Sequence, residues 1–178
     1  MDMKVVIGLG NPGAEYAVSR HNAGMMLVEV LGSRFLGLGE YGWRKFYGVY
    51  VFKTTELVLV KTANYFMNES GNVIRDVLRL DELQTVNYEL FVAHDDLDLK
   101  VGEHKIQMGK GPKVHNGVKA IERALGTKEF WRIRIGVDNR QTPIEGETYV
   151  LQKFLPEERQ VLSGVLDQIV HSFASPKE

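Results

Sequence analysis

Two groups of polar side chains in this sequence are of the types that hydrolytic enzymes use, and each follows a short apolar run. His21 comes after the run Val5–Ile7 and a glycine-rich turn, and Asp95 comes after the run Glu89–Ala93. A carboxylate bonded to one imidazole nitrogen fixes the tautomer and leaves the other nitrogen free as a base near neutral pH. If the two runs are parallel strands, their exit loops share one edge of the sheet and His21 could meet Asp95.

Each group taken alone also has a simpler structural explanation. Asp95, Asp96 and Asp98 lie close together and are of the type that caps a turn, and His21 is equally suited to hydrogen bonding within a loop. Three aspartates in a turn hold Mg²⁺ only occasionally. The five histidines are scattered and no H-E-x-x-H occurs, so we expect no metal site.

The sequence offers no obvious protein nucleophile. It has no cysteine, and Ser70 lies in Glu-Ser-Gly rather than in a G-x-S-x-G elbow. A His–Asp base acting on water remains as the hypothesis. Asn11, Asn68 and Asn116 stand in loop or helix-start positions, where neutral amides can orient a carbonyl or stabilise an oxyanion without titrating.

The turn after the first apolar run matches a nucleotide-binding pattern, but its context does not. Gly8–Gly13 has the form G-x-G-x-x-G. That motif needs a helix at its last glycine, whereas residues 14–22 show no helical apolar period. It also needs an acidic residue about 20 positions on at a strand end, and Glu29 lies within a predicted helix. We therefore reject dinucleotide binding.

Composition sets further limits. The chain has 178 residues, 44% hydrophobic and 25% charged, which is typical of one soluble globular domain. No apolar run is long enough to span a membrane, and the N-terminus enters a predicted strand at once, so we expect a cytoplasmic protein. The net charge is −1, but residues 100–140 hold ten Lys/Arg against four Asp/Glu, a local charge of +6. This segment is either a face for phosphate or an unevenly charged surface.

Periodicity predicts alternating strands and helices, and hence a mixed α/β sheet in one domain spanning residues 1–178. Residues 94–98 are expected to leave the strand as a turn, and 142–148 to form a polar loop. Gly37 and Gly39 are expected to end the first helix, and Asn68 or Ser70 to cap the second. Strands are predicted at 5–7, 47–52, 56–61, 89–93, 103–108 and 131–137, and helices at 23–35, about 68–80, 115–125 and from Pro156 onward. The last helix is expected to bury one apolar stripe made of Val161, Leu162, Val165, Leu166, Ile169, Val170 and Phe173.

Six short blocks, in order and in register, give the sequence a specific resemblance to a known family. They are GLGNPGxxY from Gly8, RHNAG from Arg20, FMNxSG from Phe66, AHDDLD from Ala93, HNG from His115 and RIRIG from Arg132. From residue 4 to about Leu155 the chain resembles bacterial peptidyl-tRNA hydrolase. The resemblance implies a monomeric α/β protein, with a twisted, mostly parallel mixed sheet flanked by helices and no cofactor, that hydrolyses the ester between a peptide and tRNA.

The resemblance also implies roles for individual residues. His21 would be the general base and Asp95 its partner. Asn11, Asn68 and Asn116 would hold the peptide and the attacking water, with Tyr16 and Met67 lining the site. Contacts with tRNA would come from Lys105, Lys110, Lys113, His115 and Arg134.

Some features depart from the family pattern, and two rival functions remain open. The run before His115 is usually rich in glycine, whereas here it contains Lys110, Pro112, Lys113 and Val114, which stiffen the loop. Lys105 is followed two residues later by Gln107, where the family usually has a second basic residue. One rival is a non-catalytic RNA-binding protein, such as the organellar splicing cofactors that share this fold. The other is an esterase for small N-acyl esters.

Overall fold

The computed structural model describes residues 2–35 and 42–174. Within these residues, seven strands form one sheet in the order β2-β3-β4-β1-β5-β7-β6. Their bounds are β1 (Met3–Gly8), β2 (Arg44–Phe46), β3 (Val49–Lys53), β4 (Leu57–Thr62), β5 (Tyr88–Lys100), β6 (His104–Met108) and β7 (Trp131–Asp138). The centre of the sheet is parallel, because β1 pairs with β4 and β5, and β5 pairs with β7. The other three pairings are antiparallel, so the predicted mixed sheet is confirmed.

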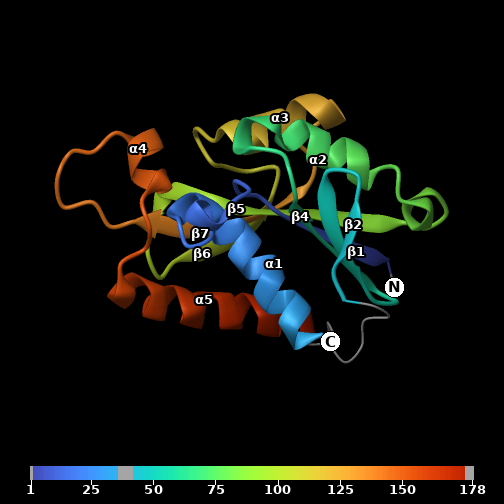
Figure 1. Cartoon of the computed structure of the whole chain (residues 1–178), viewed down its shortest axis with the longest axis horizontal. Helices are drawn as coiled ribbons and strands as arrows, with labels where there is room; N and C mark the ends of the chain where they lie inside the picture. Colours follow the sequence, from blue (N-terminus) through green and yellow to red (C-terminus); the bar gives the residue numbers. More distant parts are fainter. Residues whose placement is uncertain (1, 36–41, 175–178) are drawn as a thin grey trace.

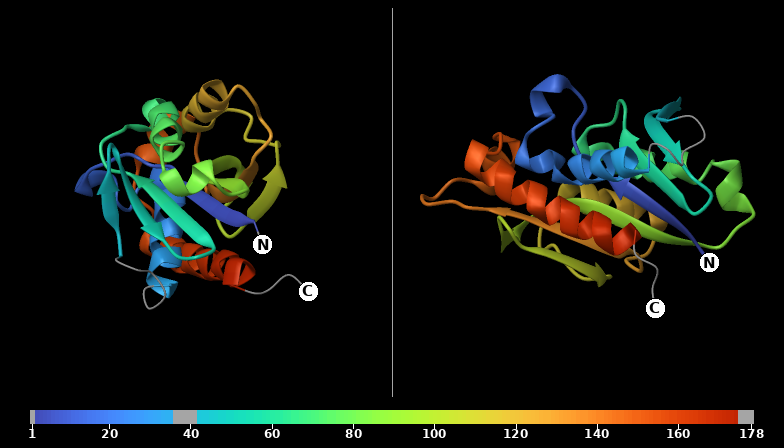
Figure 2. Two further views of the ribbon diagram at one scale, coloured as in Figure 1. Left: turned by 90° about the vertical axis from the view of Figure 1, so that its right-hand side faces the viewer. Right: turned by 90° about the horizontal axis from the view of Figure 1, so that it is seen from below.

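Helices cover both faces of this sheet. Helices α2 (Ser70–Val77) and α3 (Asn116–Leu125) lie above it in Figure 1, and α1 (Ala23–Arg34) and α5 (Pro156–Ala174) lie below. Figure 2 shows α1 and α5 side by side on their face. The remaining helices are short: α4 (Gly146–Leu151) and the 3₁₀ turns η1 (Ala14–Tyr16), η2 (Arg20–Asn22), η3 (Met67–Glu69) and η4 (Asp81–Gln84). No described helix is both long and apolar enough to span a bilayer.

Strand alternation divides the apolar core into two layers. On β1, Val6 packs with buried residues of α1 and α5, whereas Val5 and Ile7 pack with those of α2 and α3. Successive side chains of a strand point to opposite faces, so a central strand covered on both faces is apolar throughout. This explains why the first apolar run shows no alternation.

The sequence-based prediction for residues 94–98 was wrong. These residues do not form a turn after a strand but continue β5 as far as Lys100. Asp95 pairs in register with Ile135 of β7, and Asp96 pairs with Gly136. A run with four charged or polar side chains among five does not look like a buried strand. It is one here because partners elsewhere in the chain satisfy the buried carboxylates of Asp95 and Asp96.

Other local predictions also need correction. The second helix ends at Val77 rather than near residue 80. Neither Asn68 nor Ser70 caps it, since Ser70 Oγ instead donates to Met67 O at 2.7 Å. Glu69 supplies the reach-back contact, because its Oε2 accepts from the Phe66 backbone N–H at 3.0 Å.

At the C-terminal end, α4 starts inside the expected polar loop. In α5, Val161 is exposed and is not part of the buried stripe, while Leu162, Val165, Leu166, Ile169 and Val170 are buried. The two glycines expected to end the first helix, Gly37 and Gly39, lie outside the described residues. Strand β2 was not predicted, and it is only three residues long.

Helix α1 approaches the ends of β1 and β5 at bare backbone. The Leu9 N–H donates to Ala93 O at 2.9 Å, and the Met25 N–H donates to Leu9 O at 3.1 Å. A Cβ on Gly24 would lie 2.1 Å from Ala93 O, well inside van der Waals contact. Glycine is therefore required at the first turn of α1, where the helix meets Ala93, the residue directly before His94 in β5.

We expect Gly24→Ala to destabilise the protein by about 1–3 kcal/mol, the usual cost of forcing extra atoms into a packed site. Denaturant unfolding measures this change. Gly164→Ala in α5 is the matched control, since a Cβ there meets nothing within 4 Å. That control should be neutral or stabilising by up to about 1 kcal/mol. Equal stability of the two variants would contradict the close approach at Gly24.

Candidate active site

The parallel pairing of β1 and β5 places the two expected catalytic groups together. The chain leaves β1, turns, and reaches η2, which carries His21, while Asp95 lies on β5 beyond the residues that pair with β1. His21 Nδ1 donates to Asp95 Oδ1 at 2.9 Å. Asp95 is fully buried, and the His21 side chain is 15% exposed. One side of the ring is thus held by the interior and the other faces outward.

A second histidine shares the same carboxylate oxygen. His115 Nε2 lies 2.8 Å from Asp95 Oδ1, and His115 Nδ1 accepts the Val118 backbone N–H at 3.2 Å. Because Nδ1 acts as an acceptor, the ring proton is on Nε2 and is donated to Asp95. His115 therefore caps the start of α3 and orients the aspartate at the same time.

These contacts shift the pKa values of the site. Burial alone would lower the pKa of His21, but the negative charge of Asp95 and the hydrogen bond to it outweigh burial and raise that pKa above its ordinary value. For Asp95, burial would raise the pKa, but the charges and hydrogen bonds of His21 and His115 lower it well below its usual range. Asp95 is therefore a carboxylate whenever the site works as a base.

His94 is part of the support beneath the site. It is fully buried, and its Nδ1 donates to the Asp95 backbone oxygen at 2.7 Å. Burial, together with the neighbouring His115, lowers the pKa of His94 to about 3. The ring is therefore neutral at physiological pH and packs edge-on against His115, with their centroids 5.1 Å apart.

The ligand atoms of His21, Asp95 and His115 lie within 4.8 Å of one another, a spacing that a metal ion could use. The tautomer of His115 argues for another arrangement. A metal needs the lone pair of Nε2, but that atom carries the proton as long as Nδ1 accepts from Val118. The geometry is that of two N–H groups converging on one carboxylate oxygen.

A cavity of about 700 Å³ opens above this pair. Its lining includes all five residues expected to bind the peptide: Asn11, Tyr16, Met67, Asn68 and Asn116. The structure thus brings together side chains from three distant parts of the sequence. Asn68 and Asn116 are exposed at the start of their helical segments, whereas Asn11 is buried.

The position of Asn11 is fixed on both sides. Its backbone N–H donates to Asn22 Oδ1 at 2.8 Å, and its backbone oxygen accepts from Asn22 Nδ2 at 2.9 Å. Asn11 Oδ1 accepts the Met67 backbone N–H at 2.8 Å. The carboxamide oxygen is thus occupied, and the NH₂ group is the part of Asn11 that can donate to a ligand.

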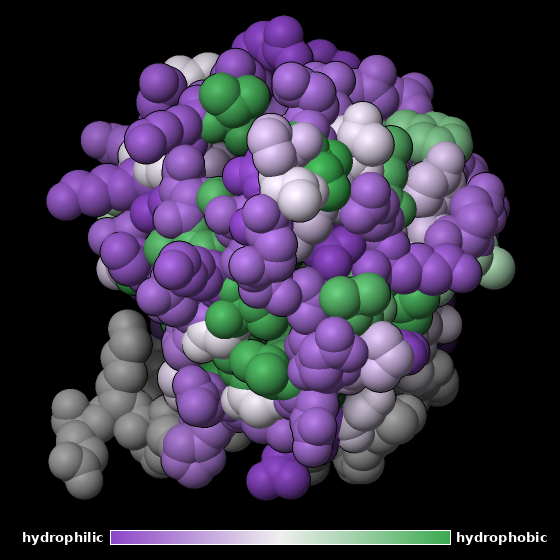
Figure 3. Space-filling view, turned by 90° about the vertical axis from the view of Figure 1, so that its left-hand side faces the viewer, coloured by the Kyte–Doolittle hydropathy of each residue, from purple (hydrophilic) through white to green (hydrophobic). Residues whose placement is uncertain are grey.

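The remaining wall of the cavity was not predicted. It comes largely from the segment around α4 and includes Phe66, Leu97, Val114, Glu145, Gly146, Glu147, Val150 and Leu151. Figure 3 views the end of the molecule where α4 lies and shows apolar side chains in small groups between polar ones. Phe66 and Leu97 belong to two of the six sequence blocks, but no block marks the α4 part of the wall, whose side chains are ordinary apolar or acidic residues.

The five residues expected to contact tRNA fall into two classes. Lys105, Lys110 and Lys113 are exposed, the first on β6 and the others on the connection from β6 to α3. His115 and Arg134 are buried and have interior partners. Contact with tRNA stays a prediction for all five, and the exposed lysines are the ones placed to make it.

Arg134 is held by two neighbours. Its Nε donates to Asp96 Oδ2 at 2.7 Å, and its Nη1 donates to Gln107 Oε1 at 2.8 Å. A basic residue at position 107 would face this guanidinium and repel it. The neutral amide of Gln107 therefore fits the arginine that it accompanies.

The connection that carries the two lysines is tethered to the sheet. Gly111 O accepts from Arg132 Nη1 at 2.7 Å, and the Lys113 backbone N–H donates to Asp98 Oδ2 at 3.0 Å. These two hydrogen bonds restrict the motion of the connection, as Pro112 is also expected to do.

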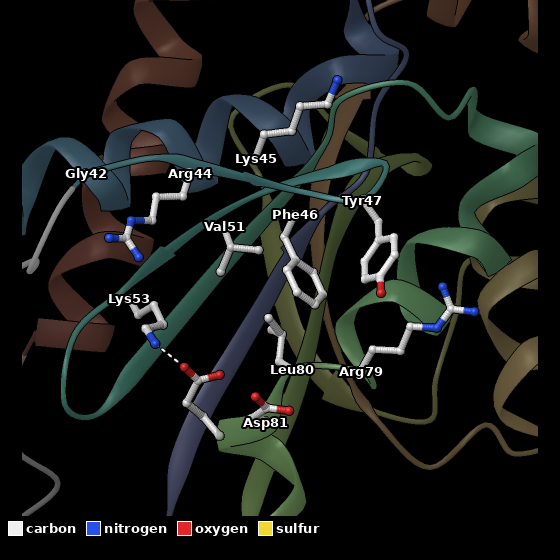
Figure 4. A pocket seen from close by; sticks show the side chains of 11 residues that line it. Gly42, Arg44, Lys45, Phe46, Tyr47, Val51, Lys53, Arg79, Leu80 and Asp81 are labelled. Atoms are coloured by element: carbon white, nitrogen blue, oxygen red, sulfur yellow. Dashed lines mark hydrogen bonds and ion pairs between the residues drawn. The ribbon is translucent and has the colours of Figure 1, made fainter.

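A second cavity, of about 450 Å³, lies between the β2–β3 turn and the end of α2 (Figure 4). Lys53 pairs with Glu82, and Arg79 pairs with Asp76 at 3.2 Å. The Arg79 guanidinium also lies 5.1 Å from the ring centroid of Tyr47. The described lining of this second cavity contains no histidine side chain. The candidate site for base catalysis is therefore the cavity above His21.

Comparison with known proteins agrees with this geometry. Residues 5–176 match the family model described as peptidyl-tRNA hydrolase. The chain is 37% identical to the peptidyl-tRNA hydrolase of Bacillus cytotoxicus over 96% of this chain and 90% of that protein. It is 38% identical to that of Geotalea uraniireducens, over 96% and 87%.

Solved structures agree as well. A crystal structure of the peptidyl-tRNA hydrolase of Acinetobacter baumannii superposes with a TM-score of 0.80 at 25% identity, covering 95% of this chain and 85% of that one. Sequence, fold and the placement of the histidine–aspartate pair lead to one conclusion: the chain belongs to the peptidyl-tRNA hydrolase family.

Proposed function

We propose that His21 is the general base with which this peptidyl-tRNA hydrolase activates water. The observation that carries the proposal is the 2.9 Å hydrogen bond from His21 Nδ1 to a buried carboxylate at the base of the largest described cavity. Because Nδ1 holds its proton for Asp95, the lone pair of the ring is on Nε2. No partner for Nε2 occurs in the described parts of the chain, which leaves it available to a water molecule.

In the reaction, Nε2 of His21 takes a proton from water as the water oxygen attacks the carbonyl carbon of the ester. The imidazolium that forms is stabilised by the charge of Asp95. Collapse of the tetrahedral intermediate breaks the bond to the ribose oxygen, and the proton returns from Nε2 to that oxygen. The products are a free peptide and tRNA with an intact 3′ hydroxyl.

Neutral amides around the cavity suit the remaining tasks. The NH₂ group of Asn11 and the side chains of Asn68 and Asn116 can donate to the peptide carbonyls and to the oxyanion without competing for the proton of His21. Tyr16 and Met67 supply apolar surface beside them. We assign contact with tRNA phosphates first to Lys105, Lys110 and Lys113, whose side chains are exposed.

We further propose that the protein is a monomer of one domain that acts in the cytoplasm. The continuous sheet, with helices on both faces, supports a single domain. A non-catalytic RNA-binding role is not favoured, since the relatives found are named as hydrolases and His21 is hydrogen-bonded to a buried carboxylate beside the cavity.

The first test is hydrolysis of an N-blocked aminoacyl-tRNA. His21→Ala should lower turnover by roughly 10²–10⁴-fold, the usual contribution of a general base. Asp95→Asn should also slow the reaction, because it weakens support for the imidazolium. Near-normal turnover by folded His21→Ala protein would show that another group activates the water. Comparison with the same ester on bare adenosine separates a tRNA hydrolase from a general esterase.

The pH profile gives an independent check on the base. His21 acts when it is neutral, so kcat/KM should fall as the pH drops through its raised pKa. In Asp95→Asn the raising charge is lost while burial remains, so the midpoint should move to lower pH. Proton NMR of the His21 ring reports the same midpoint without turnover. A midpoint that does not move in Asp95→Asn would contradict the coupling between the two groups.

The salt dependence of tRNA binding tests the lysines. Each phosphate contact contributes a slope of roughly 0.7–0.9 in a plot of log affinity against log salt. The double variant Lys110→Gln/Lys113→Gln should therefore reduce the slope by up to about two contacts. Arg34→Gln/Arg159→Gln removes the same charge at exposed positions on α1 and α5 and serves as the control. Equal slopes for both double variants would mean that Lys110 and Lys113 do not contact phosphate.

A further inference from the structure

Arg20, the neighbour of the base, is buried and reaches away from it. Its Nη2 donates to Glu158 Oε2 at 2.6 Å, and the two side chains are 4% and 3% exposed. Its Nη1 donates to Lys153 O at 3.0 Å. The guanidinium also lies 4.2 Å from the ring centroid of Tyr149 in α4. One side chain thus joins η2 to α4, to the connection after it and to the start of α5.

The acceptor of this ion pair is itself fixed. Glu158 Oε2 also accepts the Leu155 backbone N–H at 2.8 Å, and Oε1 accepts from Asn139 Nδ2 at 3.1 Å. Burial would raise the pKa of Glu158, but these hydrogen bonds and Arg20 lower it, so it stays charged. Both members of the pair therefore hold defined positions.

The backbone strengthens the same connection. The Arg20 N–H donates to Gln152 O at 3.1 Å, and the Phe154 N–H donates to Val18 O at 3.1 Å. Just before these residues, Val150 and Leu151 line the same cavity as His21. His21 and the α4 wall of the cavity are thus joined through Arg20 and these backbone bonds.

The conformation of η2 explains how the side chains of three neighbouring residues point in three different directions. A 3₁₀ helix has three residues per turn, so successive side chains point about 120° apart. Arg20 reaches the α4–α5 connection, His21 reaches Asp95 on β5, and Asn22 holds the backbone of Asn11. A shift of any one of these three contacts would rotate η2 and so displace the other two side chains.

We propose that Arg20 is a positioning residue for the hydrolysis: its ion pair with Glu158 sets the distance between His21 and the α4 wall against which the acyl group lies. This inference rests on His21 being the base. A buried ion pair adds little net stability compared with apolar packing. Its contribution here is therefore to fix the position of η2 relative to the α4–α5 connection. Lysine cannot replace arginine here, because a single ammonium does not reach the carbonyl and the carboxylate in the same planar arrangement.

The experiment compares Arg20→Lys and Glu158→Gln with a control that is destabilised elsewhere. Ile169→Ala removes buried atoms from α5 at a position that does not itself line the cavity and that takes no part in the Arg20–Glu158 pair. Turnover of an N-blocked aminoacyl-tRNA is normalised to folded protein in each case. Arg20→Lys should lower kcat by roughly 10–10²-fold, the order expected when a reacting group is misplaced by about 1 Å. KM should change little, because the lysines to which we assign tRNA contact lie elsewhere, on β6 and on the β6–α3 connection.

Two further readouts separate positioning from loss of fold. The pH midpoint of His21 should stay that of the parent, since Asp95 sets it. The losses in kcat from Arg20→Lys and Glu158→Gln should not add in the double variant, because both break one pair. If kcat per folded molecule is unchanged in Arg20→Lys, or if the losses add, Arg20 only stabilises the fold and the proposal is wrong. Failure of the base assignment would appear separately, as activity in His21→Ala.

Discussion

The site depends on a single carboxylate oxygen. Asp95 Oδ1 accepts from His21 on one side and from His115 on the other. For both bonds to form, β1 must run parallel to β5 so that η2 lies beside it, and α3 must begin where its capping histidine can reach the same atom. The close approach at Gly24 and the tie between Asn22 and Asn11 keep η2 at the required distance.

Much of this arrangement could be predicted from the sequence, because it follows from strand order. Polar residues after two apolar runs indicate one sheet edge if the runs are parallel, and this places His21 near Asp95. The hairpin of β3 and β4 was equally predictable from two β-rich runs around a short turn. In each case the signal is local and its consequence is fixed by general sheet geometry.

The parts that could not be predicted depend on distant partners. His94 to Asp98 continue a strand because His21, His115 and Arg134 satisfy the buried carboxylates of Asp95 and Asp96, and no local pattern contains those partners. For the same reason Arg134 looked like a surface cation although it is buried. The α4 wall could not be predicted because its residues are apolar or acidic residues of ordinary type. They line the cavity only because the fold brings α4 close to His21.

The order of the sheet has one consequence for how copies of the protein behave at high concentration. β2 and β6 are the outer strands of the described sheet, and each carries an exposed lysine: Lys45 at the centre of β2 and Lys105 at the second position of β6. Outer strands present unpaired backbone groups that can extend the sheet into another molecule, and a lysine there opposes such aggregation. Lys105 therefore opposes association at the β6 edge, in addition to the contact with tRNA proposed for it, and neutralising its charge would favour association there.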